Sequence, residues 1–413
     1  MSLPNVIHPG AIPAGFPTAS LPPSLSKKLR LLSRPPQEPT SIVSGEEARR
    51  RRWCRLLRLG SAWTISWVSS TRDSSSRSPV LDWDAFKPCP KKIRTKVPPE
   101  WRITVNPAAE LIGSPRLKAL IDRLYHHQKL LTEHDAKQIL SALQCMDPTA
   151  ELLLPLLTVL SNATAYPANQ ALMRELRLTD RAVEMLADSR HWPRATRVIL
   201  LQCIANMAVS SDNQIQKTMR EALPQVVQRL NSPDEMEVVV ALQALTNLSI
   251  NISKDQIPQF LPAIPHCLAR LWVRGEVNLN ALRLLVNISC CPDLVPFMLG
   301  SKAVSGLLRI LDTDREEVLL RAVTWLLCTS SAVDELHLTY DRVAQHNQDP
   351  FHNPAHTLYY SIFGLKNREE LETQAKFLAQ HSNKDIASKS LRLVDTLKNI
   401  PHFPTAGAHL NRL

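Results

Sequence analysis

Apolar residues recur at helical spacing through most of the chain, and residues 232–255 show the pattern most clearly. The apolar positions of this stretch are Val238, Ala241, Leu242, Leu245 and Leu248. They form one stripe along a helix of 3.6 residues per turn, with Asn247 beside the stripe. We expect the helix to begin at the capping hydroxyl of Ser232, with Pro233 in the first turn and the Glu235 carboxylate reaching back to the helix start.

The same pattern recurs at a nearly constant interval. An asparagine occupies the equivalent position in four stretches, at Asn162, Asn206, Asn247 and Asn287, with steps of 44, 41 and 40 residues. Cys328 continues the series 41 residues later. An all-helical repeat of about 40 to 47 residues is typical of HEAT and armadillo arrays, whose units bury their apolar faces by stacking on one another. The spacing therefore predicts an all-α superhelical solenoid.

The repeats divide the chain into a head at 1–104, a solenoid at 105–400 and a tail at 401–413. We expect a helix that begins at Asp147-Pro148 and ends at Asn162, and another that is capped by Thr313 and Glu316. The other expected helices are 117–131, 133–146, 170–177, 179–187, 193–209, 215–221, 223–230, 260–273, 278–289, 294–299, 303–311, and a closing pair at 368–381 and 384–400. No stretch indicates a sheet.

The repeat residues carry a family resemblance. Leu242 to Ser249 read Leu-x-x-Leu-x-Asn-Leu-Ser, and an Asn-Gln pair follows the preceding turn at Asn169-Gln170 and again at Asn213-Gln214. These are armadillo motifs. Residues 110–400 resemble the armadillo-like domain of the family that contains the X-linked armadillo repeat proteins and the G-protein-coupled-receptor-associated sorting proteins. The most specific segments are SNATAYPANQALMREL, LQALTNLSINISKDQI and YYSIFGLKNREELETQAKFLAQHSNKDIASKSLRLVDTLKN.

This resemblance implies a right-handed armadillo superhelix with a role in organelle-linked or receptor-linked trafficking, such as tethering mitochondria to transport machinery. It also implies a cytoplasmic location, at the mitochondrial outer membrane. Several X-linked members begin with an apolar anchor, whereas this sequence begins MSLPNVIHPGAIPAGF, which contains no such segment.

In an armadillo superhelix the third helix of each unit lines the concave surface, so the resemblance implies a ladder of amides there, formed by Asn162, Asn206, Asn247 and Asn287. An amide offers both a donor and an acceptor, and can therefore pair with the backbone of an extended peptide. The alternative is that each amide satisfies carbonyls at the end of its own repeat.

One absence narrows the class of ligand. Nuclear import receptors of this fold place a tryptophan four residues before the groove asparagine, and here those positions are Thr158, Gln202, Gln243 and Arg283. No aromatic slot can clamp a lysine side chain at these positions. We therefore expect the groove to accept a less basic partner than a nuclear localisation signal.

The positive charge is concentrated in the head. Residues 1–104 contain 18 basic and 7 acidic residues and so carry the whole net charge of +11, while basic and acidic residues balance over the solenoid. A neutral solenoid lacks the basic face that phosphate binding requires, so we expect no nucleic-acid partner. The head is rich in Pro, Ser and Arg and shows no apolar period, which predicts disorder.

A run of arginines in the head precedes a short apolar segment that contains Trp63 and Trp67. The segment is too short to cross a membrane. Three interpretations remain open: a solvated charge run, a peripheral contact with anionic lipid, or a nuclear localisation signal. The run consists of Arg49, Arg50, Arg51 and Arg52.

Enzyme motifs, phosphate loops and a CxxC pair are missing from the sequence, so we predict no catalytic residue, no cofactor and no metal. His346, His352 and His356 cluster, but Pro354 breaks the helix that a zinc motif of this spacing requires. Most of the cysteines fall in apolar helical stretches as free thiols. The sequence therefore predicts a non-enzymatic adaptor or scaffold that binds protein partners, with a membrane-tethered structural protein, docked through its basic head, as the alternative.

Overall fold

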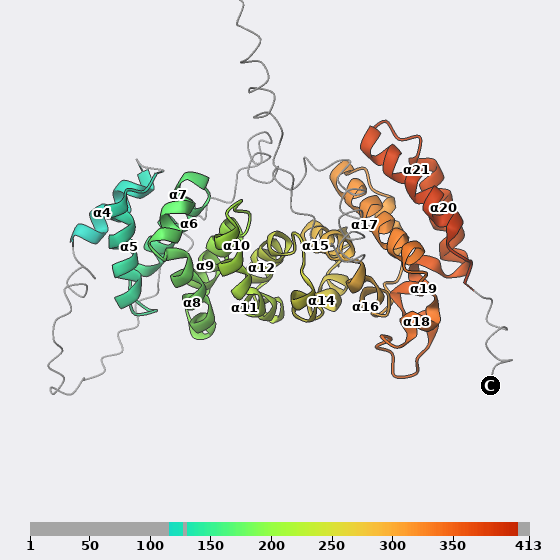
Figure 1. Ribbon diagram of the computed structural model, residues 1–413, viewed down its shortest axis with the longest axis horizontal. Coiled ribbons are helices and arrows are strands. Elements are labelled where there is room, and N and C mark those ends of the chain that lie inside the picture. The colour runs from blue at the N-terminus through green and yellow to red at the C-terminus, as the bar shows by residue number, and fades with distance from the viewer. Residues whose placement is uncertain (1–114, 127–129, 404–413) are drawn as a thin grey trace, which may run out of the picture. The chain divides into compact units, whose positions relative to one another are not determined.

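The computed structural model describes residues 115–126 and 130–403, all of which belong to one compact unit. The predicted head at 1–104, including its arginine run, Trp63 and Trp67, lies outside the described residues, and so does the tail from residue 404 onward. Over the described residues the structure is almost entirely helical (Figure 1). This confirms the prediction of an all-α solenoid.

Each repeat ends in a third helix, which from the second repeat onward is longer than the helices before it. The third helices are α6 (Leu153–Thr164), α9 (Arg194–Met207), α12 (Glu235–Leu248), α15 (Leu279–Ser289) and α17 (Glu316–Glu335). The other helices are α4 (Pro115–His126), α5 (Glu133–Cys145), α7 (Pro167–Glu175), α8 (Leu178–Asp188), α10 (Asn213–Glu221), α11 (Leu223–Gln228), α13 (Ile257–Phe260), α14 (Ala263–Ala269), α16 (Val295–Leu299), α18 (Tyr340–Ala344), α19 (Leu358–Phe363), α20 (Leu365–Leu378) and α21 (Lys384–Asn399). Short 3-10 turns join them at η3 (Ser189–His191), η4 (Arg229–Asn231), η5 (Lys254–Gln256), η6 (Pro292–Leu294), η7 (Leu307–Leu311) and η8 (Pro354–His356).

The third helices form one continuous layer. Helix α6 packs on α9, α9 on α12, α12 on α15, and α15 on α17, and α21 packs on the far side of α17 (Figure 1). The apolar stripe predicted from the sequence is the buried face of this layer: Leu245 in α12 and Trp325 in α17 are both fully buried. The hydrophobic core therefore runs through the repeats without a break.

Helix α12 begins two residues later than the sequence predicts. Its N-cap is Asp234, whose side chain accepts a hydrogen bond from the backbone N–H of Met236 at 3.0 Å. Ser232 is therefore not the cap. Its hydroxyl instead donates to the carboxylate of Glu237 at 2.7 Å. Serine and aspartate are both common N-cap residues. Here Asp234 is the cap, because the hydroxyl of Ser232 is hydrogen-bonded to the carboxylate of Glu237.

Two other predicted caps are also wrong. Asp147 accepts hydrogen bonds from the backbone and hydroxyl of Thr149 and caps no helix, because α6 begins only at Leu153. The helix runs to Thr164, two residues beyond the predicted end. Likewise, α17 follows Arg315 without any side-chain cap, and Thr313 only accepts from the N–H of Arg315.

The predicted helix at 260–273 and the expectation of no sheet are both wrong. The helix breaks at Pro262, which has no N–H to donate, into α13 and α14. A β-hairpin follows α14. Its strands, β1 (Trp272–Val273) and β2 (Glu276–Val277), have two residues each and are connected by Arg274 and Gly275. Both of these turn residues have positive φ, 53° and 85°, which is the signature of a type I′ turn.

The predicted helix at 303–311 is replaced by an extended segment and η7. Lys302 forms an antiparallel bridge with Thr357, and the N–H of Ala303 donates to the carbonyl of His356 at 2.8 Å. This pairing with a segment more than fifty residues away holds the backbone out of the helical conformation. Only residues Leu307–Leu311 are helical.

Ion pairs between neighbouring repeats fix their register. The guanidinium of Arg197 in α9 donates to both carboxylate oxygens of Glu237 in α12, at 3.0 and 2.9 Å. Arg229 approaches the same carboxylate at 3.5 Å, and only 1% of the Glu237 side chain is exposed. A second arginine of α9, Arg194, pairs with Asp234. Because a buried carboxylate is stable only with such partners, α9 and α12 are held in one alignment.

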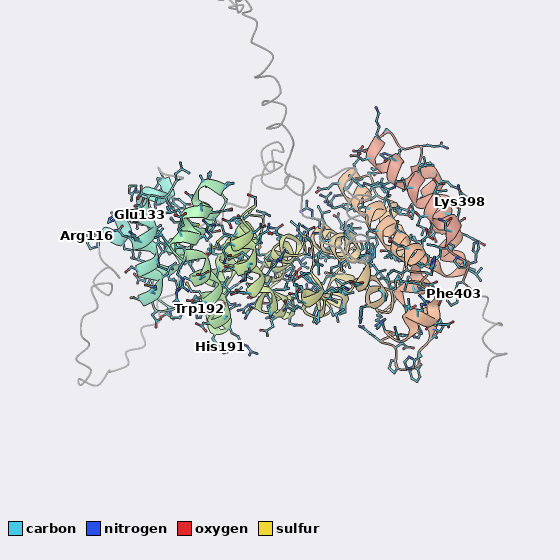
Figure 2. All side chains as sticks on the ribbon, in the orientation of Figure 1. Arg116, Glu133, His191, Trp192, Lys398 and Phe403 are labelled. Carbon is cyan, nitrogen blue, oxygen red and sulfur yellow. The ribbon has the colours of Figure 1, made fainter. Side chains whose placement is uncertain are left out.

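The C-terminal helices close the array as predicted. Arg368 of α20 is almost fully buried, and its guanidinium donates to the carbonyls of Leu397 and Ile400 at the end of α21. Beyond α21, Phe403 packs edge-on against Tyr340 and Tyr360, with ring centroids 5.6 and 5.7 Å apart (Figure 2). The chain therefore folds back over α18 and α19 after its last helix.

Candidate functional site

The four predicted asparagines lie on consecutive third helices and at the same place in each repeat. Asn162 is in α6, Asn206 in α9, Asn247 in α12 and Asn287 in α15. Asn162 is exposed, and the other three are half-buried. We call the surface formed by these four residues and the residues four positions before them the asparagine face.

Three of the amides bridge neighbouring repeats. The amide nitrogen of Asn206 donates to the carbonyl of Ser161 at 3.1 Å, and that of Asn247 donates to the carbonyl of Ala205 at 2.8 Å. Asn287 donates to the carbonyl of Thr246 at 2.8 Å. The sequence left open the alternative that each amide bonds within its own repeat. The bonds instead satisfy carbonyls near the end of the preceding third helix.

These bonds use the amide nitrogens as donors, so the amide oxygens can still accept hydrogen bonds. Among the described residues, no donor reaches Oδ1 of Asn247 or Asn287, whereas Oδ1 of Asn206 accepts from Gln202 at 2.9 Å. The side chain of Asn162, at the start of the series, makes no hydrogen bond within the part of the chain that the structure describes. Such oxygens, at a regular interval on a half-exposed face, can accept N–H groups from an extended backbone.

The positions four residues before the asparagines differ along the array. Thr158 donates its hydroxyl to the carbonyl of Leu154 within α6, and Gln202 is engaged by Asn206. Arg283 donates to the carboxylate of Glu317 in α17, at 2.5 Å. The face therefore changes from neutral amides and hydroxyls in its first repeats to a charged cluster at α15 and α17.

The Asn-Gln pair of the repeat motif has a structural role. Asn169 in α7 is buried, accepts from the N–H of Leu131 at 2.9 Å and donates to the carbonyl of Ala163 at 2.9 Å. Gln170 donates to the carbonyl of Thr164 at 3.0 Å. The pair thus satisfies carbonyls at the end of α6 and joins α7 to the preceding repeat.

A sequence model of the Armadillo-like family matches residues 131–341, which is more than half of the chain. The chain belongs to the Armadillo-like family. This matches the predicted armadillo-type superhelical solenoid, and it agrees with the stacked third helices described above. The narrower resemblance to the X-linked and receptor-associated sorting proteins stays a prediction.

The solved structures similar to this armadillo-like chain include engineered proteins and designed armadillo repeat proteins. An engineered protein is 12% identical, covering 71% of each chain, with a TM-score of 0.48. A designed armadillo repeat protein in complex with the peptide (KR)4 is 16% identical over 68% of this chain and 99% of its own, with a TM-score of 0.42. Computationally designed armadillo repeat proteins for modular peptide recognition are 18% identical, with the same coverage and a TM-score of 0.43.

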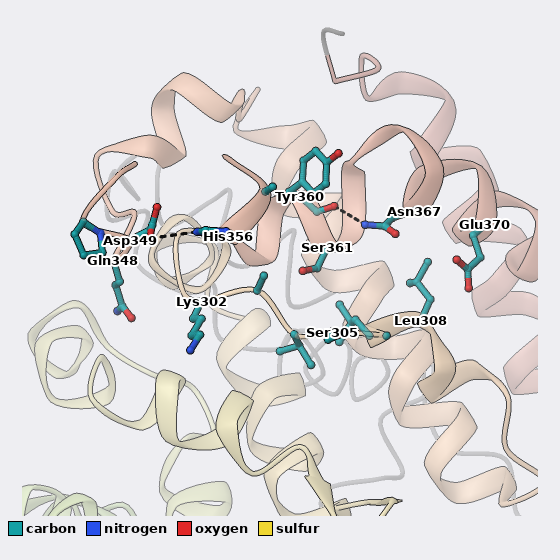
Figure 3. A pocket seen from close by; sticks show the side chains of 16 residues that line it. Lys302, Ser305, Leu308, Gln348, Asp349, His356, Tyr360, Ser361, Asn367 and Glu370 are labelled. Atoms are coloured by element: carbon teal, nitrogen blue, oxygen red, sulfur yellow. Dashed lines mark hydrogen bonds and ion pairs between the residues drawn. The ribbon is translucent and has the colours of Figure 1, made fainter. Parts of the chain in front are cut away.

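The armadillo-like array also contains a cavity that the sequence did not predict. Its volume is about 820 Å³, and it lies between residues 302–308 and the segment that contains η8, α19 and the start of α20 (Figure 3). Asp349 and His356, 3.3 Å apart, line one side, and Asn367 donates to the carbonyl of Tyr360 on the other. Two segments distant in the sequence form its walls, so no local motif could have indicated it.

The histidine cluster is dispersed in the structure. The ring of His346 packs on Phe297 with centroids 4.1 Å apart, and its burial lowers the pKa of the imidazole. His356 faces Asp349, and His352 lies exposed in the loop between α18 and η8. Within the described residues there is no group of three or more side chains that could hold a metal ion.

No disulfide joins the cysteines of the described region to one another. Burial raises the pKa of Cys203 and of Cys267 to about 12, so both remain protonated in the core. Cys290 at the end of α15 lies 4.0 Å from Cys328 in α17, sulfur to sulfur. Cys328 thus occupies the position of the repeat asparagine on α17. Like the asparagines it contacts the preceding repeat, but through a sulfur atom instead of an amide.

No single helix of the described chain is both long and apolar enough for a membrane span. Helix α15 and the following residues up to Leu299 meet the requirement only when taken together, across a bend of 109°.

Proposed function

We propose that this armadillo-like protein is a non-enzymatic adaptor or scaffold that binds extended segments of partner proteins along the asparagine face. The observation that carries the proposal is the row of half-buried amides whose donors are fixed by the preceding repeat. The Oδ1 atoms of Asn247 and Asn287, one repeat apart, remain available as hydrogen-bond acceptors. An extended backbone presents N–H groups to such acceptors whatever its side chains are.

The test is a quantitative affinity purification of partners with the full chain, comparing the wild type with the double substitution of Asn247→Ala and Asn287→Ala. Gln170→Ala is the matched control, because it also removes an amide-to-carbonyl hydrogen bond but lies on α7, outside the third helices. We expect partners to be lost from the double variant and kept by the control. Equal partner sets in all three proteins would overturn the proposal.

The finer part of the proposal concerns location and pathway. We propose that the adaptor acts in the cytoplasm at the mitochondrial outer membrane, in organelle or receptor trafficking, because its closing segment at 359–399 resembles the X-linked and sorting-protein family. Imaging of the full chain at endogenous level tests this. Exclusive nuclear staining would contradict it and favour the localisation-signal interpretation of the head.

The competing candidate is a membrane-tethered structural protein, supported by the arginine run and by Trp63 and Trp67 in the sequence. Basic residues near anionic lipid contribute about 1 kcal/mol each to binding. Flotation of the full chain with phosphatidylserine vesicles at physiological salt, with and without alanine at the four arginines, is the test. A wild-type chain that stays at the bottom of the gradient would exclude this candidate.

A further inference from the structure

The asparagine face changes its chemistry at α15. In the first three repeats, the residue four positions before the asparagine is neutral, whereas the fourth repeat has Arg283. Arg321 in α17 lies seven residues before Cys328, two helical turns along the same side of its helix, because seven residues make about two turns. The two guanidiniums meet at one carboxylate, that of Glu317.

This carboxylate is shared unequally. Oε1 of Glu317 is 2.5 Å from Nη2 of Arg283 and 3.2 Å from Nη2 of Arg321, so one oxygen serves both arginines. The Nε of Arg283 is buried and has no hydrogen-bond partner among the described residues. A guanidinium normally engages a carboxylate through two parallel N–H groups, so the cluster has more donors than its acceptor can satisfy.

The cluster also has an excess of positive charge. Two arginines and one glutamate carry a net formal charge of +1, and the arginine side chains are only 18% and 20% exposed. Burial, followed by the charge of Arg283, lowers the pKa of Arg321, as expected for a cation held near another cation. A second carboxylate would relieve this repulsion by offsetting the excess of positive charge.

Positive charge continues onto the next helix of the layer. Hydrogen bonding with Cys290, together with the charges of Lys389 and Arg392, lowers the pKa of Cys328 in α17. Both of these basic residues are in α21, which packs directly on α17. The C-terminal part of the layer thus carries basic side chains from α15, α17 and α21.

We propose that the cluster of Arg283, Glu317 and Arg321 binds a carboxylate side chain of the partner, so that the adaptor selects segments that are acidic where they cross α15 and α17. This inference rests on the proposed peptide-binding function and specifies its partner. The occupant is a segment of another protein and not the head of this chain, because the head has a net charge of +11 and would be repelled.

The test uses the full chain and three fluorescein-labelled decapeptides in which serine alternates with glutamate, glutamine or lysine. Affinity is measured by fluorescence anisotropy at low and at physiological salt. We expect the glutamate peptide to bind most tightly and to weaken with salt, since charge attraction is screened. Arg283→Gln and Arg321→Gln should each weaken it by about tenfold or more, as expected for hydrogen bonds to a charged group.

Two further variants separate recognition from structure. Glu317→Gln removes the internal competitor for the two arginines and should tighten binding of the glutamate peptide, a gain that misfolding cannot produce. Arg270→Gln is the control for charge. It removes one guanidinium, at the residue that follows α14, which pairs with Glu235 at the start of α12 at 2.7 Å and lies outside the cluster. It should leave the affinity unchanged.

The possible results distinguish failure of the proposed acidic preference from failure of the adaptor function. Equal affinities for the glutamate and glutamine peptides, both weakened by Asn247→Ala, would overturn the acidic preference and leave the adaptor function standing. No binding of any of the three peptides would contradict the adaptor function itself. Displacement of the glutamate peptide by an oligothymidylate at lower concentration than by unlabelled peptide would overturn the inference in favour of a nucleic acid.

Discussion

Asn247 and Asn287 each combine two roles in one side chain. The amide nitrogen holds the preceding repeat, and the amide oxygen has no hydrogen-bond donor among the described residues. The sequence pattern placed the four asparagines on equivalent positions correctly, because helical periodicity determines which side of a helix a residue occupies. It could not decide the hydrogen-bond partners, since these carbonyls lie more than forty residues earlier and come close only when the repeats stack.

The first prediction concerns this division of roles. Asn247→Ala removes a 2.8 Å hydrogen bond between repeats and should lower the free energy of unfolding by about 0.5–1.5 kcal/mol. Asn162→Ala changes an exposed residue whose side chain makes no hydrogen bond to the described residues, and should change the free energy of unfolding by no more than about 0.5 kcal/mol. Urea unfolding followed by circular dichroism measures both. Equal losses in the two variants would mean that the bond between repeats contributes nothing.

A second prediction concerns the core. Leu245 is fully buried in the layer, so Leu245→Ala leaves a cavity and should cost about 2–5 kcal/mol. Met236→Ala, in the first turn of the same helix, truncates a side chain that is 46% exposed and should cost much less. Thermal unfolding of the two variants side by side gives the comparison. A larger loss for Met236→Ala would contradict the placement of the apolar stripe.

At the scale of elements, the sequence gives the helices reliably and their ends poorly. Long apolar stripes such as that of α12 determine a helix, because every turn adds to the same buried face. The ends depend on single side chains. Ser232 and Asp234 are both good caps, and only the position of Glu237 in the folded repeat shows which one is free to act.

The hairpin after α14 was missed for a related reason. Its strands have two residues each, too short to show alternation, and Trp272 and Val273 extend the apolar pattern of the preceding helix. Gly275, at φ 85°, was the available signal. A glycine directly after a polar residue, here Arg274-Gly275, is a short-range indication of a tight turn.

The third prediction is a pH dependence at the contact between α9 and α12. Burial alone would raise the pKa of Glu237, but hydrogen bonds from Arg197 and Ser232 and the charges of Arg197 and Arg229 hold it below its usual value. A carboxyl whose folded pKa is depressed stabilises the fold fully above its unfolded pKa, about 4.3. That contribution is lost as the pH falls through the folded pKa.

Glu237→Gln should therefore be less stable than the wild type at pH 7, by about 1.5–3 kcal/mol for hydrogen bonds to a charged group, and should lose less stability between pH 5 and pH 3. Denaturant midpoints at each pH test this. Glu151→Gln, at an exposed carboxylate between α5 and α6, controls for the general effect of acid. Parallel pH profiles for Glu237→Gln and the wild type would contradict the prediction.

At the scale of the whole array, the repeat interval predicted the architecture, since each unit must bury its apolar face on its neighbours. Features made by distant segments could not be predicted in this way. The cavity beside the bridge of Lys302 and Thr357 and the pairing of Arg283 with Glu317 both join residues that no local pattern connects. The sequence shows Arg283 at the fourth position of the series, but its meeting with Arg321 at the carboxylate of Glu317 became visible only with the third helices stacked.

The last prediction concerns the closing helix. Helix α21 packs on α17 and α20, and buries Ile386, Leu393 and Leu397. Fully burying such a side chain contributes about 1.5–3 kcal/mol, and a terminal unit of a solenoid keeps the apolar face of the unit before it from water. A chain that ends at His381 would expose that side of α17, and would leave Arg368 without the carbonyls of Leu397 and Ile400.

We therefore expect the chain that ends at His381 to unfold at a lower temperature, to bind the dye ANS more strongly, and to self-associate in analytical ultracentrifugation. A chain that ends at Phe403 keeps α21 and the packing of Phe403 on Tyr340 and Tyr360, and is the matched control. It should behave as the full chain does. If both truncations instead match the full chain, α17 ends the core, and α21 is an addition that the armadillo-like array does not need for its stability.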